Sequence, residues 1–329
     1  MRRLMNILRW IFYLILALVA LTVTLIIVNL KSDLPLEGLK SRWTDKNSRF
    51  VEVDGMQVHY RDQGTGPVLV LIHGTSSSLH TWDGWSDALH KTMRVVRMDL
   101  PAFGLTGPSP ARDYSLDTYV AFIDHFATKL GLQQFALAGN SLGGTISWKY
   151  TVAHPDRVRA LILVDSGGFP VTASSAPIAF RLGGLEPLSK LLVRLDTRYF
   201  VEDGVKKSYG DPGRLRPETV DRYYELTLRP GNREAFADRM RVPRPDETSL
   251  LSGIKVPTLV LWGGRDNLIP VETAQRFGHA ISGAKVVVYD DLGHVPMEED
   301  AARTSAEAGR FLAENAPKVA ESPAGSAAK

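Results

Sequence analysis

The sequence predicts an α/β fold: a mainly parallel sheet with helices on both faces, an inserted helical cap and an N-terminal transmembrane helix. Three observations lead to this prediction. Short apolar runs alternate with helical patterns between about residues 49 and 314, the alternation stops between 169 and 256, and 21 uncharged residues occupy Trp10–Leu30. Alternating strands and helices are typical of a parallel sheet that is covered on both sides.

The strand patterns come first along the chain. Runs that begin at Phe50 and Met56 flank a turn at Asp54-Gly55 and predict two paired strands. Six later runs are short and mostly almost wholly apolar, as expected for strands buried on both faces. They are Pro67–Gly74, Arg94–Leu100, Phe135–Asn140, Ala160–Ser166, Pro257–Gly264 and Ala284–Asp291.

Helical patterns separate several of these runs. Apolar residues recur at helical spacing in Ser115–Leu130, and Thr273–Ile281 and Ala301–Leu312 are similar. We therefore assign the core to residues 49–168 and 257–314. Residues 169–256 hold helical patterns that begin at Ile178 and Glu218, with no convincing core strand. Because a structureless loop of that length is improbable, this segment predicts a helical cap inserted between two core strands.

The N-terminal run is long enough to span a membrane. A helix over Trp10–Leu30 is roughly 30 Å long, about the thickness of a bilayer core. A cleaved signal peptide is the alternative, but the run exceeds a usual signal core and no small-x-small cleavage site follows it. The basic tail of residues 1–9 favours a cytoplasmic N-terminus and an exported catalytic domain, although lysines and arginines within residues 31–48 weaken that bias.

The remaining ends and the composition set further limits. Residues 31–48 are polar and predict an irregular linker, while residues 315–329 are rich in Ala, Pro and Ser and predict a disordered tail. The chain has no cysteine, which excludes disulfides, zinc–thiolate sites and cysteine nucleophiles. A net charge of +3 without a long basic run argues against a nucleic-acid partner.

Ser141 is the candidate nucleophile. It lies in Gly139-Asn140-Ser141-Leu142-Gly143, after one predicted strand and before a segment that can form a helix. This is the Gly-x-Ser-x-Gly pattern in the strand–turn–helix context of a nucleophile elbow. The turn exposes the hydroxyl above the sheet, at the positive end of the helix.

His294 is the candidate base among eight histidines, because it follows the last predicted strand and so reaches the sheet edge that holds Ser141. Asp266 follows the preceding strand, 28 residues earlier, and is the favoured orienting carboxylate, with Asp165 as the competing candidate. Such a carboxylate fixes the imidazole tautomer and stabilises the imidazolium. The backbone N–H groups of Leu142 and Thr75 are the candidate oxyanion donors.

These motifs resemble the α/β-hydrolase superfamily as a set, over about residues 50–314. They are, in order, His73-Gly74, Asp99-Leu-Pro-Ala-Phe-Gly104, Gly139-Asn-Ser-Leu-Gly-Gly144, Gly263-Gly-Arg-Asp266 and Gly293-His294. The resemblance implies an eight-stranded core, a helical cap, hydrolysis of an ester or related bond through an acyl-serine, and no cofactor or metal.

Within that superfamily, Gly-Asn-Ser-x-Gly-Gly is similar to both bacterial lipases and meta-cleavage-product C–C hydrolases. The C–C enzymes usually carry Gly-Pro-Gly in the oxyanion loop and Trp after the catalytic histidine, where this chain has Thr75–Ser78 and Val295. Relatives that act as haloalkane dehalogenases or epoxide hydrolases use an aspartate nucleophile, and Ser141 argues against both.

The leading hypothesis is a membrane-anchored serine hydrolase that cleaves carboxylic esters, with lipids among its candidate substrates. The anchor and four apolar cap residues (Phe180, Leu191, Leu192 and Val193) suggest acyl substrates near the bilayer, such as monoacylglycerols or lysolipids. Two alternatives stay open. One is a C–C hydrolase of the meta-cleavage type, motivated by Asn140, and the other is a non-catalytic binding module on the hydrolase fold.

Overall fold

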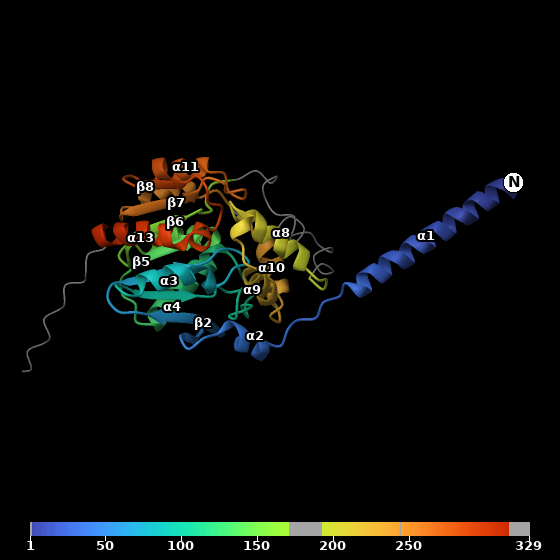
Figure 1. The fold of residues 1–329 in the computed structure, drawn as a ribbon, viewed down its shortest axis with the longest axis horizontal. Coiled ribbons are helices and arrows are strands. Elements are labelled where there is room, and N and C mark those ends of the chain that lie inside the picture. Colours follow the sequence, from blue (N-terminus) through green and yellow to red (C-terminus); the bar gives the residue numbers. More distant parts are fainter. Residues whose placement is uncertain (1, 171–192, 244, 316–329) are drawn as a thin grey trace, which may run out of the picture.

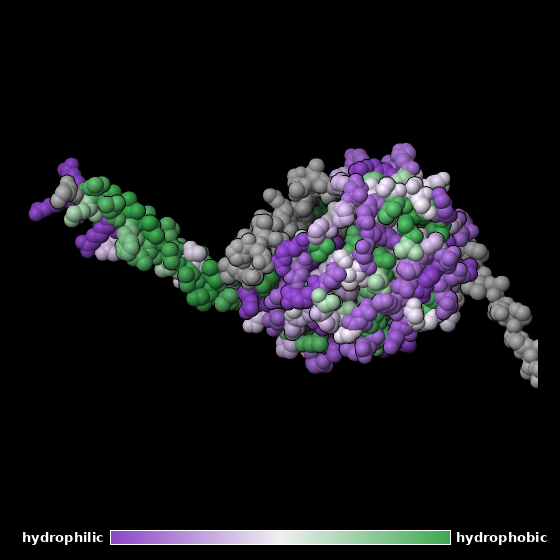
Figure 2. All heavy atoms as spheres, turned by 180° about the vertical axis from the view of Figure 1, so that it is seen from behind, coloured by the Kyte–Doolittle hydropathy of each residue, from purple (hydrophilic) through white to green (hydrophobic). Residues whose placement is uncertain are grey.

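The chain forms a rounded body from which one long helix projects (Figure 1). The computed structural model describes residues 2–170, 193–243 and 245–315. The projecting helix, α1 (Arg2–Val28), has no buried residue, and Figure 2 shows a continuous apolar surface along most of it. It is long and apolar enough to cross a membrane by length and composition, and it begins well before the predicted start at Trp10.

The body is built on one eight-stranded sheet with the strand order β1-β2-β4-β3-β5-β6-β7-β8. β2 is antiparallel to β1 and to β4, and all other neighbours are parallel, which confirms the predicted mainly parallel sheet. The strands are β1 (Ser48–Val53), β2 (Met56–Gln63), β3 (Val68–Ile72), β4 (Arg94–Met98), β5 (Phe135–Asn140), β6 (Val158–Val164), β7 (Thr258–Gly263) and β8 (Lys285–Tyr289).

Helices cover both faces of this sheet, which explains why its central strands are almost wholly apolar. Alternate residues of β3 point to opposite sides: Val70 belongs to a core cluster with α4 and α5, and Leu71 to a cluster with α3 and α13. α11 packs with α5 over β6 and β7 in a third cluster. These helices are α3 (Asp83–Leu89), α4 (Leu116–Lys129), α5 (Leu142–Ala153), α11 (Glu272–Ala280) and α13 (Ala301–Asn315).

A group of helices between β6 and β7 lies at one end of the sheet (Figure 1). They are α8 (Arg198–Ser208), η2 (Pro212–Arg214), α9 (Pro217–Thr227) and α10 (Asn232–Arg241). The following η3 (Thr248–Gly253) packs against α5 and α11. All fall within the segment 169–256 that we predict to be a cap, and α9 matches the helical pattern from Glu218. Most of the pattern from Ile178, with Phe180, Leu191 and Leu192, lies outside the described residues.

The segment between α1 and the sheet differs from its prediction. Residues 31–48 were expected to be irregular, but they contain α2 (Leu36–Trp43), which buries Leu39 against Leu105 and Leu226. With eight residues and one buried side chain, α2 is too short to produce a recognisable apolar period. At the other end, Asn315 still belongs to α13, and the rest of the expected tail lies outside the described residues.

Candidate active site

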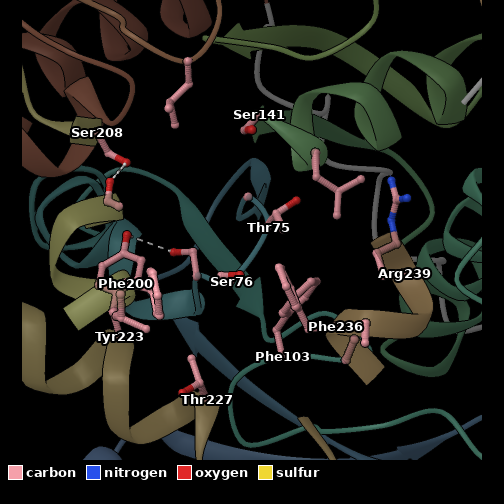
Figure 3. Close-up of a pocket in the computed structure, with 18 of the residues that line it drawn as sticks. Thr75, Ser76, Phe103, Ser141, Phe200, Ser208, Tyr223, Thr227, Phe236 and Arg239 are labelled. Carbon is pink, nitrogen blue, oxygen red and sulfur yellow. Dashed lines mark hydrogen bonds between the residues drawn. The ribbon is translucent and has the colours of Figure 1, made fainter. Parts of the chain in front are cut away.

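Ser141 lies in the sharp turn between β5 and α5. Its backbone has φ 54° and ψ −116°, a conformation that non-glycine residues rarely adopt and that marks a strained functional turn. The turn needs small neighbours, because a Cβ on Gly139 would lie 2.2 Å from the Gly143 carbonyl oxygen, and one on Gly143 would lie 2.2 Å from that of Ile72. The geometry is therefore that of a nucleophile elbow, and the Ser141 side chain faces a cavity (Figure 3).

His294 and Asp266 meet at the same edge of the sheet. Asp266 follows β7, His294 follows β8, and His294 Nδ1 lies 2.7 Å from Asp266 Oδ2. The other Asp266 oxygen accepts hydrogen bonds from the N–H groups of Leu268 and Ile269, at 2.7 and 3.0 Å. Both side chains are almost fully shielded from solvent. These bonds fix the carboxylate, which in turn holds the imidazole with its proton on Nδ1.

The structure brings the candidate base His294 and the candidate nucleophile Ser141 to one cavity. Both residues line the same cavity, and among the described residues neither the Ser141 hydroxyl nor His294 Nε2 has a hydrogen-bond partner. The backbone of the elbow is also tied to the histidine loop, because the Asn140 side-chain amide donates to the His294 carbonyl at 2.9 Å. The three candidate residues for nucleophile, base and orienting acid therefore come from loops that border one another at the same sheet edge.

Asp165, the competing acid, lies beside this group without bonding to the histidine. It follows β6, is fully buried, and accepts a hydrogen bond at 2.9 Å from the Gly263 N–H. Its Oδ2 has no donor in the described part of the chain. Burial and the neighbouring Asp266 carboxylate raise the pKa of Asp165 well above its usual range. Asp165 is therefore the member of the pair that is suited to hold a proton.

The two candidate oxyanion donors, Thr75 and Leu142, border the same cavity as Ser141, and Figure 3 shows Thr75 beside it. Leu142 begins α5, so its N–H is one of the first in the helix that no carbonyl within the helix can satisfy. Thr75 comes from the loop after β3. Within the described residues, neither N–H donates a hydrogen bond, so both are available to an oxyanion.

Other histidines have structural contacts. His73 is fully buried, with Nδ1 bonded to the Gly74 carbonyl and Nε2 accepting from the Leu100 N–H. Burial lowers the pKa of His73, which favours the neutral ring that this hydrogen-bond pattern requires. His125 is exposed on α4 and pairs with Asp54 at 2.8 Å. Neither histidine borders the cavity.

Two residues near the site escaped the sequence-based prediction. Asn140 bridges the elbow to the carbonyls of Val164 and His294, although the motif alone singles it out only for its resemblance to C–C hydrolases. Glu299 accepts hydrogen bonds from the N–H groups of Gly293 and Gly210, and so ties the histidine loop to the cap. A carboxylate that binds backbone amides across the chain leaves no signature in residue spacing.

The cavity above Ser141 has a volume of about 890 Å³ and is bordered by residues of the core, of the segment 169–256 and of α1. From the cap, Phe200, Tyr223 and Phe236 face into it (Figure 3). Val193, one of the predicted apolar cap residues, also lines it. Cavities of this size hold drug-sized or lipid-sized ligands.

Among the described residues, the one group of histidine and acidic side chains close enough to share a metal ion is Asp165, Asp266 and His294, with ligand atoms within 4.8 Å of one another. Asp266 already uses both oxygens in hydrogen bonds, one of them to His294 Nδ1. The donor set therefore fits a hydrogen-bonded acid–base pair better than a metal centre.

Comparisons with known proteins agree with this fold. The model of the alpha/beta hydrolase fold family matches residues 67–301. A 2-hydroxymuconate semialdehyde hydrolase of Pseudomonas sp. (strain CF600) is 29% identical over 279 residues, which are 81% of this chain and 94% of that protein.

Two solved structures are also similar. A membrane phospholipase A, described as a bacterial virulence factor, is 26% identical with a TM-score of 0.70, and the match covers 94% of this chain and 99% of that one. A thermophilic esterase from Thermogutta terrifontis, with malate bound, is 25% identical with a TM-score of 0.69, covering 81% of this chain and 97% of that one.

Proposed function

The chain belongs to the alpha/beta hydrolase fold family, and from that premise we propose that it is a membrane-anchored serine hydrolase that cleaves carboxylic esters. The observation that carries the proposal is the hydrogen bond of 2.7 Å between His294 Nδ1 and Asp266 Oδ2. His294 lines the same cavity as Ser141, which lies in the strained turn before α5. The esterase and phospholipase among the similar structures support ester chemistry.

The proposed reaction has two halves. Ser141 Oγ attacks the acyl carbon while His294 Nε2 takes its proton, and the resulting oxyanion is held by the Thr75 and Leu142 N–H groups. The imidazolium, stabilised by Asp266, then gives the proton to the leaving alcohol. Water attacks the acyl-serine with His294 again as the base, releasing the acid and restoring Ser141. One ester and one water thus become one acid and one alcohol.

The anchor is part of the proposal. α1 supplies a candidate membrane span, and the similar membrane phospholipase covers almost the whole chain. We infer a single-pass protein with a cytoplasmic N-terminus and an exported catalytic domain, because Arg2, Arg3 and Arg9 cluster at the start of α1. In this arrangement the core comprises residues 49–168 and 257–314, and residues 169–256 form the cap.

A panel of acyl esters of increasing chain length tests this function. The full chain in detergent or vesicles is expected to hydrolyse medium- and long-chain esters, and Ser141→Ala is expected to abolish turnover. A strong preference for acetyl esters over longer chains would contradict the assignment to lipid-like acyl substrates. Intact secondary structure in Ser141→Ala, measured by circular dichroism, serves as the control.

The similarity to a 2-hydroxymuconate semialdehyde hydrolase supports a second candidate, hydrolysis of a C–C bond in a ring-cleavage dienoate. Asn140, which motivates it, uses its amide to hold the carbonyls of Val164 and His294. Turnover of a vinylogous diketone without ester hydrolysis would favour this candidate. Ester hydrolysis without turnover of the diketone would exclude it.

A further inference from the structure

We propose that the active-site cavity opens onto the lipid bilayer beside the end of α1, so that acyl substrates enter from the membrane rather than from water. This inference rests on the proposed function and adds to it an entry route for its candidate substrates, membrane-resident esters with long hydrocarbon chains. The evidence comes from the wall of the cavity, from the attachment of α1 to the cap, and from the exposed face of α8.

One part of the cavity wall belongs to the membrane helix itself. Thr22, Leu25 and Ile26 of α1, and Asn29 directly after it, line the same cavity as Ser141. Thr22 lies six residues before Val28, the last residue of α1, which corresponds to about 9 Å along the helix. Because Thr22, Leu25 and Ile26 belong to the helix that we propose to span the bilayer, the part of the cavity that they border lies at the level of the lipid chains.

The end of α1 is bonded to the cap, so the membrane helix and the cavity mouth are held together. The Lys31 N–H donates to the Arg194 carbonyl at 2.9 Å, and the Asp196 N–H donates to the Asn29 carbonyl at 2.8 Å. Arg233, which is almost fully buried, reinforces this junction by donating to the Lys31 carbonyl at 2.8 Å. These bonds therefore keep the mouth of the cavity next to the end of α1 when α1 is inserted in the bilayer.

The cap exposes large apolar side chains next to this junction. Tyr199 is 76% exposed and Phe200 is 37% exposed, both at the start of α8 and a few residues after the bonded segment. Leu30, at the junction itself, is 54% exposed. Phe200 also lines the cavity (Figure 3). Aromatic side chains at such a position are typical of a membrane–water interface, where one end of the ring is apolar and the other wet.

The side chains that line the cavity indicate which class of ligand it binds. The wall of the cavity includes many hydrocarbon side chains, among them Leu25, Ile26, Leu195, Phe200 and Val201. A long acyl chain that moves from the bilayer into this space exchanges one apolar environment for another and never exposes its methylenes to water. A substrate dissolved in water gains nothing from this route. The matching ligand is therefore a lipid ester whose acyl chain is inserted in the membrane.

A tryptophan placed at the mouth tests the route. Ile26 lines the cavity, whereas its neighbour Ile27 does not and is 60% exposed, so Ile26→Trp and Ile27→Trp are matched variants. Each full-length protein is reconstituted in phosphatidylcholine vesicles that contain 1-oleoylglycerol, and p-nitrophenyl butyrate is the soluble comparison. We expect Ile26→Trp to lower kcat/KM for the embedded ester about tenfold more than for the soluble ester, and Ile27→Trp to leave that ratio unchanged.

The possible outcomes distinguish a failure of the bilayer route from a failure of the proposed ester hydrolase function. Equal effects of Ile26→Trp on both substrates would overturn the bilayer route while leaving the ester hydrolase in place. So would a wild-type protein that cleaves the soluble ester but not the embedded one. Failure of the wild type to cleave either ester would overturn the proposed function itself, and the inference with it.

A fluorescence measurement tests the position of the cap without using catalysis. Because the chain has no cysteine, Tyr199→Cys and Gln133→Cys each create a single site for a nitrobenzoxadiazole label. Gln133 is exposed just before β5, at the sheet edge opposite Ser141, and serves as the control. Lipids with spin-labelled acyl chains are expected to quench the label at Tyr199→Cys and not at Gln133→Cys. Equal quenching at both sites would contradict the docking of the cap on the bilayer.

Discussion

Exchanging each of the two neighbouring carboxylates for an amide separates their roles. Asp165→Asn and Asp266→Asn make the same chemical change at sites whose ligand atoms lie within 4.8 Å of each other. Two negative charges at that separation repel by about 3.5 kcal/mol at an effective dielectric constant of about 20. This repulsion and the burial of Asp165 favour one shared proton, and the bond from Asp266 to His294 leaves that proton to Asp165.

Asp165→Asn therefore resembles the protonated acid that it replaces. The amide oxygen can still accept from the Gly263 N–H, and the amide nitrogen can donate towards Asp266. We expect kcat/KM for a soluble ester to stay within about threefold of the wild type. In Asp266→Asn, the amide can no longer hold the imidazole in its required tautomer, and kcat is expected to fall about 10⁴-fold, or about 5.4 kcal/mol of transition-state stabilisation.

Steady-state kinetics on p-nitrophenyl butyrate measure both effects, and thermal denaturation shows whether each variant is folded. A loss in folded Asp165→Asn as large as that in Asp266→Asn would refute the reasoning. It would make Asp165 the orienting acid, or show that its carboxylate acts in the charged form.

Three further predictions concern the surroundings of the site. Asn140→Ala leaves the His294 carbonyl without its donor, while the Val164 carbonyl keeps the hydrogen bond from the Ser141 N–H. The expected cost is about 1–3 kcal/mol for the one unsatisfied group, and kinetics should show a lower kcat with a smaller change in KM; unchanged kcat and stability would contradict this role. The pKa of Asp165 is raised in the folded state. The free energy of unfolding should therefore fall as pH rises from the usual carboxyl range to that raised pKa. Urea denaturation at several pH values should show this fall in the wild type and not in Asp165→Asn. Burial and the nearby Arg222 lower the pKa of His80 to about 3. The free energy of unfolding should therefore decline as pH falls from about 6.5 towards that value. A folded His80→Gln variant whose free energy of unfolding changes with pH in the same way as that of the wild type would argue against this contribution.

The sequence was sufficient to predict the elements with strong local patterns. The apolar runs at β3, β5, β6 and β7 are legible because both faces of these strands are buried, and parallel pairing brings the residues after them to one edge. That reasoning places Ser141, Asp266 and His294 near one another. It also places Asp165 there, and only distances separate the two acids: Asp266 reaches His294 Nδ1, whereas Asp165 bonds to the Gly263 N–H.

Features that depend on long-range contacts could not be predicted in this way. α2 has too few residues to show a period, and it is held by Leu39 against Leu105 and Leu226, which lie far away in the sequence. Likewise, no pattern in residues 22–29 reveals that one side of α1 borders the active-site cavity. That contact arises from backbone bonds between the end of α1 and the cap, which any residue type can make.

The central claim is that Ser141 is a nucleophile activated by His294, and covalent labelling tests it most directly. The full-length protein is treated with a fluorophosphonate probe, and the modified residue is located by mass spectrometry. We predict an adduct on Ser141 in the wild type, none in Ser141→Ala, and a strongly reduced labelling rate in His294→Ala. A folded wild-type protein that takes up no label, or that is modified at another residue, would contradict the claim.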